Sequence, residues 1–240
     1  RSTLFPYTTL FRSRVTRAEA LLRWNDPKRG PIPPGTFIPV AEEGGLMRDL
    51  GHWVLETACR QAAAWRNAGL GDLVVAVNLS AGQLRDSTIL SELEAIIEST
   101  GCSPTWLSLE ITETSMVRDL EGVSLTLGKL RRLGFRIAID DFGTGFSSLS
   151  HLRHLPVDTL KIDRSFVAKI ATGGGRPGLI KTLIALAKEM RIKVIAEGIE
   201  TPEQLAYLTA HGCHYGQGYH LCRPLAPEAA EVMLEGGSVT

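Results

Sequence analysis

Polar side chains of one kind stand at the ends of several apolar runs in this chain. Each run has the composition of a β-strand and closes on a carboxylate or an amide: Glu19, Asn78, Glu110, Asp140 and Asp141. A carboxylate inside an apolar strand is costly to bury unless another group pairs with it. Several such groups from different strands can be buried together when they converge on a cation. The pattern therefore predicts a divalent-metal site.

The composition is that of one large soluble domain. The chain has 240 residues, of which 44% are hydrophobic and 22% charged, enough for a substantial core. Its 26 basic residues balance 26 acidic ones, so no overall charge attracts polymeric nucleic acid or an anionic membrane. No apolar stretch approaches the roughly 20 residues of a spanning helix, and the four cysteines form no CxxC pair. We expect a cytoplasmic domain with reduced thiols and no membrane contact.

The first thirteen residues differ from the rest. Residues 1–13, RSTLFPYTTLFRS, match the in-frame translation of a widely used DNA-sequencing adapter at every codon. We interpret residues 1–13 as an assembly artefact, residues 14–240 as the native barrel domain, and leave the artefact out of the fold prediction.

Strands and helices alternate through the remainder. Strands are expected at residues 15–24, 73–80, 106–112, 135–141, 160–163, 193–197 and 215–220. Helices are expected between them, among others at residues 48–67, 88–99, 177–190 and 202–210. Strands that are apolar on both faces and separated by helices indicate a parallel sheet covered by helices.

Seven such units predict an α/β fold, a (β/α)₈ TIM-like barrel whose first native strand is truncated and replaced by the artefactual N-terminus. The chemistry of such a barrel collects at the carboxyl ends of its strands. The alternative is an open doubly wound sheet, but no G-x-G-x-x-G follows the first strand to support it.

Six short motifs occur in a fixed order. They are Glu19-Ala20-Leu21, Asn78-Leu79-Ser80, Glu110-Ile111-Thr112-Glu113, Asp140-Asp141-Phe142-Gly143-Thr144-Gly145, Lys161-Ile162-Asp163 and Glu197-Gly198-Ile199-Glu200. Each is weak alone, but the ordered set resembles the EAL-domain family of cyclic di-GMP phosphodiesterases. The resemblance covers about residues 15–225. It implies a barrel that hydrolyses one phosphodiester bond of cyclic di-GMP to linear pGpG, with two Mg²⁺ or Mn²⁺ ions per site.

The resemblance also implies which residues hold the metal. Glu19, Asn78, Glu110 and Asp140 would hold one ion, with Asp140 shared and Asp141 serving the second. Oxygen ligands of this kind suit Mg²⁺ and Mn²⁺. Neighbouring strand residues face opposite ways, so we expect a bend at the strand end that turns Asp140 and Asp141 to the same side.

Catalytic, substrate-binding and loop residues follow from the same resemblance. Lys161 would hold the attacking water or the phosphate, and Glu197 would accept the proton of that water or support a metal. Which of the two is the base stays open, because geometry must decide it. Arg23, Gln217 and Glu200 would contact the substrate. Glu113 would anchor the loop that follows Asp141.

The chain departs from the family pattern at its amino end. The family opens on a strand with a Gln-Pro pair, and the corresponding register here falls on Phe5-Pro6, within the suspected artefact. A barrel without an authentic first strand leaves ladder groups unpaired, so this chain is expected to fold or act poorly. The family further implies a homodimer and upstream sensor or cyclase domains that are missing from this fragment.

Two other functions stay open from the sequence. The first is a non-catalytic cyclic di-GMP receptor of the same fold, a class that usually lacks metal carboxylates or the lysine. The second is a metal-dependent barrel enzyme for another substrate, such as an aldolase or an enolase type.

Overall fold

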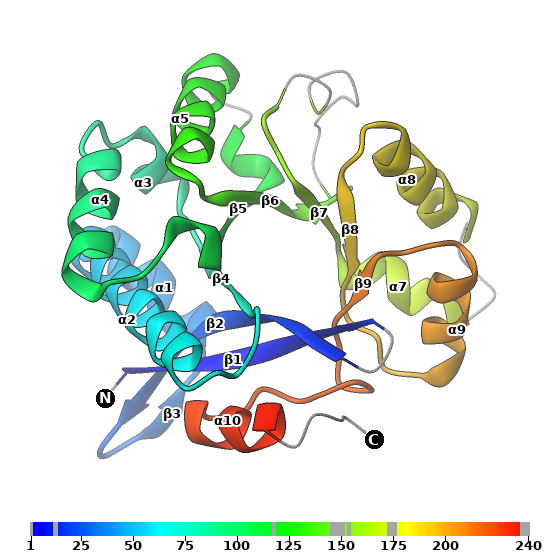
Figure 1. Ribbon diagram of the computed structural model, residues 1–240, viewed down its shortest axis with the longest axis horizontal. Helices are drawn as coiled ribbons and strands as arrows, with labels where there is room; N and C mark the ends of the chain where they lie inside the picture. Colours follow the sequence, from blue (N-terminus) through cyan, green and yellow to red (C-terminus); the bar gives the residue numbers. More distant parts are fainter. Residues whose placement is uncertain are drawn as a thin grey trace.

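The structure is a computed structural model, and it describes residues 2–11, 14–116, 119–144, 152, 155–171 and 177–235. For residues 2–11, 14, 171 and 177 only the backbone is described. Figure 1 shows strands arranged around a centre, with helices outside them. This is the TIM-like barrel that the alternation of elements predicts.

One sheet carries all the strands of the described residues. Its order is β1-β9-β8-β7-β6-β5-β4-β2-β3, and a further pairing of β1 with β2 closes it into a barrel that leaves β3 outside. The strands are β1 Ser2–Phe11, β2 Arg14–Asp26, β3 Gly30–Ile32, β4 Val74–Asn78, β5 Leu107–Thr112, β6 Arg136–Phe142, β7 Thr159–Ile162, β8 Lys193–Ala196 and β9 Tyr215–Gly216.

Helices connect the strands and cover their outer faces. They are α1 Pro34–Glu43, α2 Met47–Asn67, α3 Ala81–Arg85, α4 Ile89–Thr100, α5 Leu120–Leu133, α7 Arg164–Ala171, α8 Pro177–Glu189, α9 Pro202–Ala210 and α10 Pro227–Glu235, with 3₁₀ turns η1 Pro104–Trp106 and η2 Glu113–Met116. In α5, Val123, Leu127 and Leu130 recur at helical spacing and are fully buried. The core therefore lies between the helices and the outer face of the barrel.

The predicted strands are present, with corrected ends. From β2 to β9 around the barrel, neighbouring strands pair in parallel, as the apolar runs indicate. The last strand ends at Gly216 rather than at residue 220, because the chain turns to bring Gln217 back toward the barrel centre. The structure also contains β3, α3, α7 and α10, which the sequence patterns did not predict.

β1 departs from the parallel pattern of the barrel, as does β3 outside the barrel, which pairs antiparallel with β2. β1 pairs antiparallel with β2 and with β9. Only two residues separate β1 from β2, and a connection that short permits a hairpin, whereas a parallel pair needs a crossover of a dozen or more residues. Residues 2–11 thus take the closing position in the ladder. Their origin as an artefact stays a prediction.

Two other expectations concern cysteines and membranes. Cys59, Cys102 and Cys213 are buried free thiols, and Cys222 is a half-buried one. This confirms the absence of a disulfide frame. Of the helices in the described ranges, none combines the length and the apolar character that crossing a membrane requires.

His214, just before β9, leads to a prediction about pH. Its Nδ1 accepts a hydrogen bond from the backbone N–H of Val194 at 3.1 Å, so Nδ1 must carry no proton. Burial, and then Lys193 and Lys188, lower the pKa of His214 below its ordinary 6.5. The unfolded chain therefore binds this proton more readily, and the stability that neutral His214 contributes is lost as the pH falls below about 6.5.

The change that tests this is His214→Asn, whose amide oxygen can accept the same hydrogen bond without titrating. Urea unfolding should show the parent chain losing more stability than His214→Asn between about pH 7 and about pH 5. Parallel pH profiles for the two proteins would show that His214 plays no such part.

Candidate functional site

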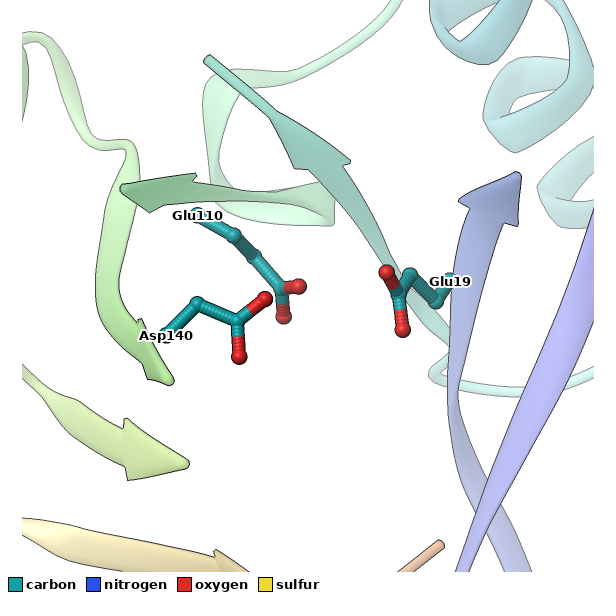
Figure 2. Close-up of side chains that lie close together, drawn as sticks. All are labelled: Glu19, Glu110 and Asp140. Carbon is teal, nitrogen blue, oxygen red and sulfur yellow. The ribbon is translucent and has the colours of Figure 1, made fainter. Parts of the chain in front are cut away.

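Three buried carboxylates from separate strands meet inside one end of the barrel. Glu19 comes from β2, Glu110 from β5 and Asp140 from β6, and a carboxylate oxygen of each lies within 4.8 Å of the others. In Figure 2 the three side chains point toward a common centre. Parallel strands end on the same side of a barrel, so residues far apart in the chain converge there. The structure thus brings together three of the predicted metal-binding residues.

Lys161, on β7, lies at the centre of the cluster. Its Nζ donates to Glu110 Oε2 at 2.6 Å and to Asp140 Oδ2 at 3.0 Å. Glu197 Oε1 is 2.8 Å away and Glu19 Oε2 is 3.5 Å away. Only 1% of the lysine is exposed. A buried ammonium ion that faces four carboxylates is a fixed positive charge.

A second group of carboxylates shares Asp140. Carboxylate oxygens of Asp140, Asp141 and Glu197 lie within 4.8 Å of one another. Asp141 has a φ of 53°, and the β6–β7 register shifts between Ile139 and Phe142. This irregularity confirms the predicted bend, because a regular strand would turn the two aspartates to opposite faces.

Two amides hold Glu19 in place. Asn78 Nδ2 donates to Glu19 Oε1 at 3.0 Å, and Gln217 Nε2 donates to Glu19 Oε2 at 2.8 Å. Asn78 lies at the end of β4, where it pairs with Glu110 of β5. The sequence assigned Gln217 to substrate alone, so its contact with Glu19 is new. A glutamine directly after the last strand, at a position that proves to be buried, was the available signal for it.

Burial and mutual repulsion shape the charges of the cluster. Burial raises the pKa of Glu110 well above its usual range, and Glu19 and Asp140 add to this against the opposing effect of Lys161. Burial also raises the pKa of Glu197, to about 7. For Glu19, burial is outweighed by Lys161 and by the amides of Gln217 and Asn78, so its pKa is lowered. The pKa of Lys161 is raised well above its usual range because its carboxylates outweigh its burial.

The donor set fits divalent cations. One lysine cannot neutralise Glu19, Glu110, Asp140, Asp141 and Glu197 together. Burial, and then repulsion between neighbouring carboxylates, raises the pKa of Glu110, Asp141 and Glu197 and so favours their protonated forms. A divalent cation would compensate the charge that protons otherwise compensate. All the donors are hard oxygens, the class that Mg²⁺ and Mn²⁺ prefer.

A cleft of about 330 Å³ opens beside the cluster. Its wall includes the cluster residues Glu19, Asp140, Asp141, Lys161 and Glu197 and the three candidate substrate-binding residues, Arg23, Glu200 and Gln217. Arg23 lies outside the carboxylate cluster, and its Nη1 donates to the carbonyl oxygen of Leu22 at 2.9 Å. Glu200 is exposed on the wall.

Arg164 and Tyr219, also on the wall, were not singled out from the sequence, and Asp163 was named there only as part of a motif, without a role. Tyr219 is 53% exposed, and the Arg223 guanidinium lies over its ring at 4.7 Å. The available signal for Tyr219 was an aromatic residue two positions after Gln217, in a segment expected to end a strand. Gly218 between them needs to be glycine, since a Cβ there would lie 2.1 Å from the backbone oxygen of Ile199.

Glu113 supports the loop after β6. It is 1% exposed in η2, and its Oε2 accepts a hydrogen bond from the backbone N–H of Gly143 at 2.8 Å. Gly143 has a φ of +98°, and a Cβ there would lie 2.9 Å from the ring of Phe166. The contact holds the chain two residues beyond Asp141. It is the kind of contact that a loop-anchoring residue makes.

Comparisons with known proteins agree with this geometry. The EAL domain family matches residues 5–224 of the chain. The chain is 40% identical over 229 residues to the cyclic di-GMP phosphodiesterase NbdA of Pseudomonas aeruginosa, covering 95% of this chain and 29% of that protein. It is 38% identical over 221 residues to the cyclic di-GMP phosphodiesterase PdeR of Escherichia coli, covering 92% of this chain and 33% of that protein.

A solved structure also resembles the chain over nearly its whole length. The PaMucR phosphodiesterase in complex with c-di-GMP superposes with a TM-score of 0.92 at 38% identity, covering 95% of this chain and 94% of that one. The chain itself spans only about a third of the curated relatives named above. With a family match across most of its length, the chain belongs to the EAL domain family.

Proposed function

We propose that this chain hydrolyses cyclic di-GMP, opening one of its two phosphodiester bonds to give linear pGpG. Water adds to phosphorus, the bond from phosphorus to the 3′ oxygen of the sugar breaks, and that oxygen takes up a proton. The observation that carries the proposal is the group of buried carboxylates around Lys161, next to a cleft at the carboxyl end of the barrel. Relatives at about 40% identity bear the name of this activity.

Two divalent cations, Mg²⁺ or Mn²⁺, belong to this proposal. Glu19, Asn78, Glu110 and Asp140 would hold one, and Asp140 and Asp141 would hold the other. When bound, such ions activate water near neutral pH and neutralise charge on the phosphate oxygens. Asn78 and Gln217 orient Glu19 from either side, which keeps its carboxylate in one position.

Lys161 and Glu197 take different parts in the proposal. The Nζ of Lys161 lies within 3.5 Å of carboxylate oxygens from four residues. Lys161 therefore stays an ammonium ion that positions acidic groups and water. Glu197 lies on the wall of the cleft with one oxygen on Lys161. We assign Glu197 as the base that accepts the proton of the attacking water. A base must reach the substrate side, and it must itself be deprotonated before it can accept that proton.

The remaining cleft residues would bind the nucleotide. The planar guanidinium of Arg23 suits two oxygens of a phosphate. Glu200 and Gln217 lie on the same wall and would contact the substrate beside it. In this proposal the phosphate would lie between Arg23 and the carboxylates, with the bases toward the outer wall.

The direct test is a hydrolysis assay with chromatographic detection of pGpG. The chain with added Mg²⁺ or Mn²⁺ should form pGpG, and a chelator or Glu19→Ala should stop it. Binding of cyclic di-GMP without hydrolysis would identify the receptor alternative. Failure to bind any cyclic dinucleotide would favour a different substrate.

The assembly and the setting of the domain are part of the proposal. We expect a cytoplasmic homodimer, measured as mass by light scattering. We also expect sensor or cyclase domains upstream, because the curated relatives are longer and one, MucR of Pseudomonas aeruginosa, is named as a bifunctional diguanylate cyclase and phosphodiesterase. Residues 1–13 would not be native, and codons unrelated to the adapter in the encoding DNA would refute this.

Glu113 provides a prediction about the loop. Glu113→Ala removes the acceptor of the Gly143 N–H and is expected to lower kcat by about tenfold, since the loop that follows Asp141 loses its support. Glu113→Gln keeps an acceptor oxygen and should retain most of the turnover. Steady-state kinetics of the two variants would check this, and full activity of Glu113→Ala would remove Glu113 from the mechanism.

A further inference from the structure

A buried arginine lies in the barrel at the end opposite to the carboxylates. Arg17 of β2 is 5% exposed. It precedes Glu19 by two residues and so shares the inward face of the strand, nearer the amino end. Its Nη2 donates to Thr159 Oγ1 at 3.4 Å, and its guanidinium lies 5.2 Å from the centre of the Tyr215 ring.

Arg17 has no adequate partner for its charge. Within the described residues, its Nη1 makes no hydrogen bond and none of the ion pairs includes it. A buried guanidinium is expected to pair with an anion, because an uncompensated buried charge is costly. Burial lowers the pKa of Arg17 and Arg136 lowers it further, against the opposing effects of Tyr215, Glu110 and Asp158. The Nη1 of Arg17 is therefore a buried donor without an acceptor, although Nη2 reaches Thr159.

Arg17 lines a large groove at the amino end of the barrel. The groove has a volume of about 1120 Å³ and lies at the amino ends of β6, β7, β8 and β9. The ends of α5 and α8 form its sides, and Figure 1 shows α8 outside β7 and β8. Half of its wall is apolar, with side chains such as Leu186, Met190 and Ile192.

Positive charge exceeds negative charge around this groove. Four more cationic residues line it: Arg131, Arg136, Arg191 and Lys193. The acidic residues on its wall are Asp158 and Glu189. Asp158 is already engaged, since one oxygen pairs with Arg131 at 3.1 Å and the other accepts the N–H of Ile137 at 2.9 Å. The groove thus offers cations without matching anions.

We propose that this groove binds a small organic phosphate, with the phosphate group toward Arg17, Arg136 and Lys193 and an apolar or aromatic body against α8. A phosphate matches the planar fork of arginine and accepts several hydrogen bonds at once. The volume far exceeds that of a bare phosphate ion and lies just above the range of about 300–1,000 Å³ that is typical of pockets for small molecules. The site is separate from the cleft beside Lys161, and it stands whether or not the proposed hydrolysis is correct.

The probe for this site is phenyl phosphate, with inorganic phosphate beside it. Binding is measured by titration calorimetry on the chelator-treated chain, so that metal ions at the carboxylates cannot bind the phosphate. Phenyl phosphate should bind more tightly than inorganic phosphate, because only the former reaches the apolar wall. Arg17→Met, which replaces the charge with an apolar chain of similar length, should weaken phenyl phosphate binding by about tenfold or more.

Matched variants locate the binding. Arg136→Gln and Lys193→Gln alter exposed side chains and should each weaken binding even if Arg17→Met fails to fold. Arg132→Gln, on the exposed surface of α5 outside the groove, should have no effect, whereas Arg23→Gln tests whether the probe binds in the cleft at the opposite end instead. The proposal is overturned by an absence of binding at millimolar phenyl phosphate, by equal affinity for both probes, or by losses that follow Arg23 instead of Arg136 and Lys193.

Discussion

Replacing Glu110 with glutamine is expected to reduce hydrolysis of cyclic di-GMP by about 10²–10³-fold while leaving the metal-free protein at least as stable as before. The side chain keeps its shape, and its amide oxygen can still accept from Lys161 Nζ, which now lies 2.6 Å from Glu110 Oε2. What is lost is one negative charge from the set that would bind a cation. Rates of pGpG formation and metal titrations by calorimetry measure this loss.

The expected stability of Glu110→Gln follows from the direction in which the pKa of Glu110 is shifted. Burial, with Glu19 and Asp140, raises the pKa of Glu110 above its ordinary 4.5, so the folded chain holds a proton that the unfolded chain releases. The stability linked to that proton is complete below about pH 4.5 and is lost as the pH rises through the folded-state pKa. The advantage of Glu110→Gln over the parent chain should therefore grow with pH in chelator-treated samples.

Glu98→Gln serves as the control for Glu110→Gln, because Glu98 is exposed on α4 and far from the cluster in the fold. It should change neither the rate nor the unfolding curve. A Glu110→Gln protein with full activity would contradict the role of Glu110 as a metal-binding residue. A large loss of stability in the metal-free state would contradict the electrostatic account of the cluster.

Replacing Lys161 with methionine is expected to have the opposite effect on stability. The substitution removes the ammonium ion that faces Glu19, Glu110, Asp140 and Glu197, and leaves them without compensation in a site that is almost fully buried. Breaking a buried ion pair from one side costs about 3–5 kcal/mol. Hydrolysis should fall by about 10³-fold as well, since the charge that positions the reacting groups is gone.

Two conditions should reduce the stability deficit of Lys161→Met. Lower pH lets the carboxylates take up protons, so the loss of stability should be larger at about pH 8 than at about pH 5. Added Mn²⁺ or Mg²⁺ should also stabilise the variant, because a cation can replace the lost charge. Thermal unfolding across pH and metal concentration measures both effects. Lys181→Met, at an exposed position of α8, is the control, and a deficit independent of pH would count against this account.

Much of the site could be predicted because each motif occupies the end of an apolar run. The barrel brings Glu19, Glu110 and Asp140 together as expected, and the bend at Asp141 agrees with the requirement that adjacent aspartates face the same side. These predictions depend on local rules: the alternation of strand faces and the common direction of parallel strands. The antiparallel pairing of β1 was not predicted because residues 1–13 were set aside before the fold was considered.

The contacts that join the site could not be predicted in the same way. Lys161 reaches Glu19 across 142 positions, and Gln217 reaches it across 198. No spacing rule relates residues so far apart, and the resemblance assigned Gln217 to the substrate only. The unpaired Arg17 was missed for the same reason, since its lack of an acceptor depends on which side chains line the opposite end of the barrel.

By itself, the order of apolar runs and terminal carboxylates determined the barrel, the end at which its chemistry lies, and the family. Only the tertiary structure decided which carboxylates share Lys161, which amides hold Glu19, and where a buried charge is left without a partner. The periodicity of a strand depends only on residues that are neighbours in the sequence, so it can be recognised without the fold. Charge compensation depends on distances between side chains from different strands, and these exist only once the barrel has closed.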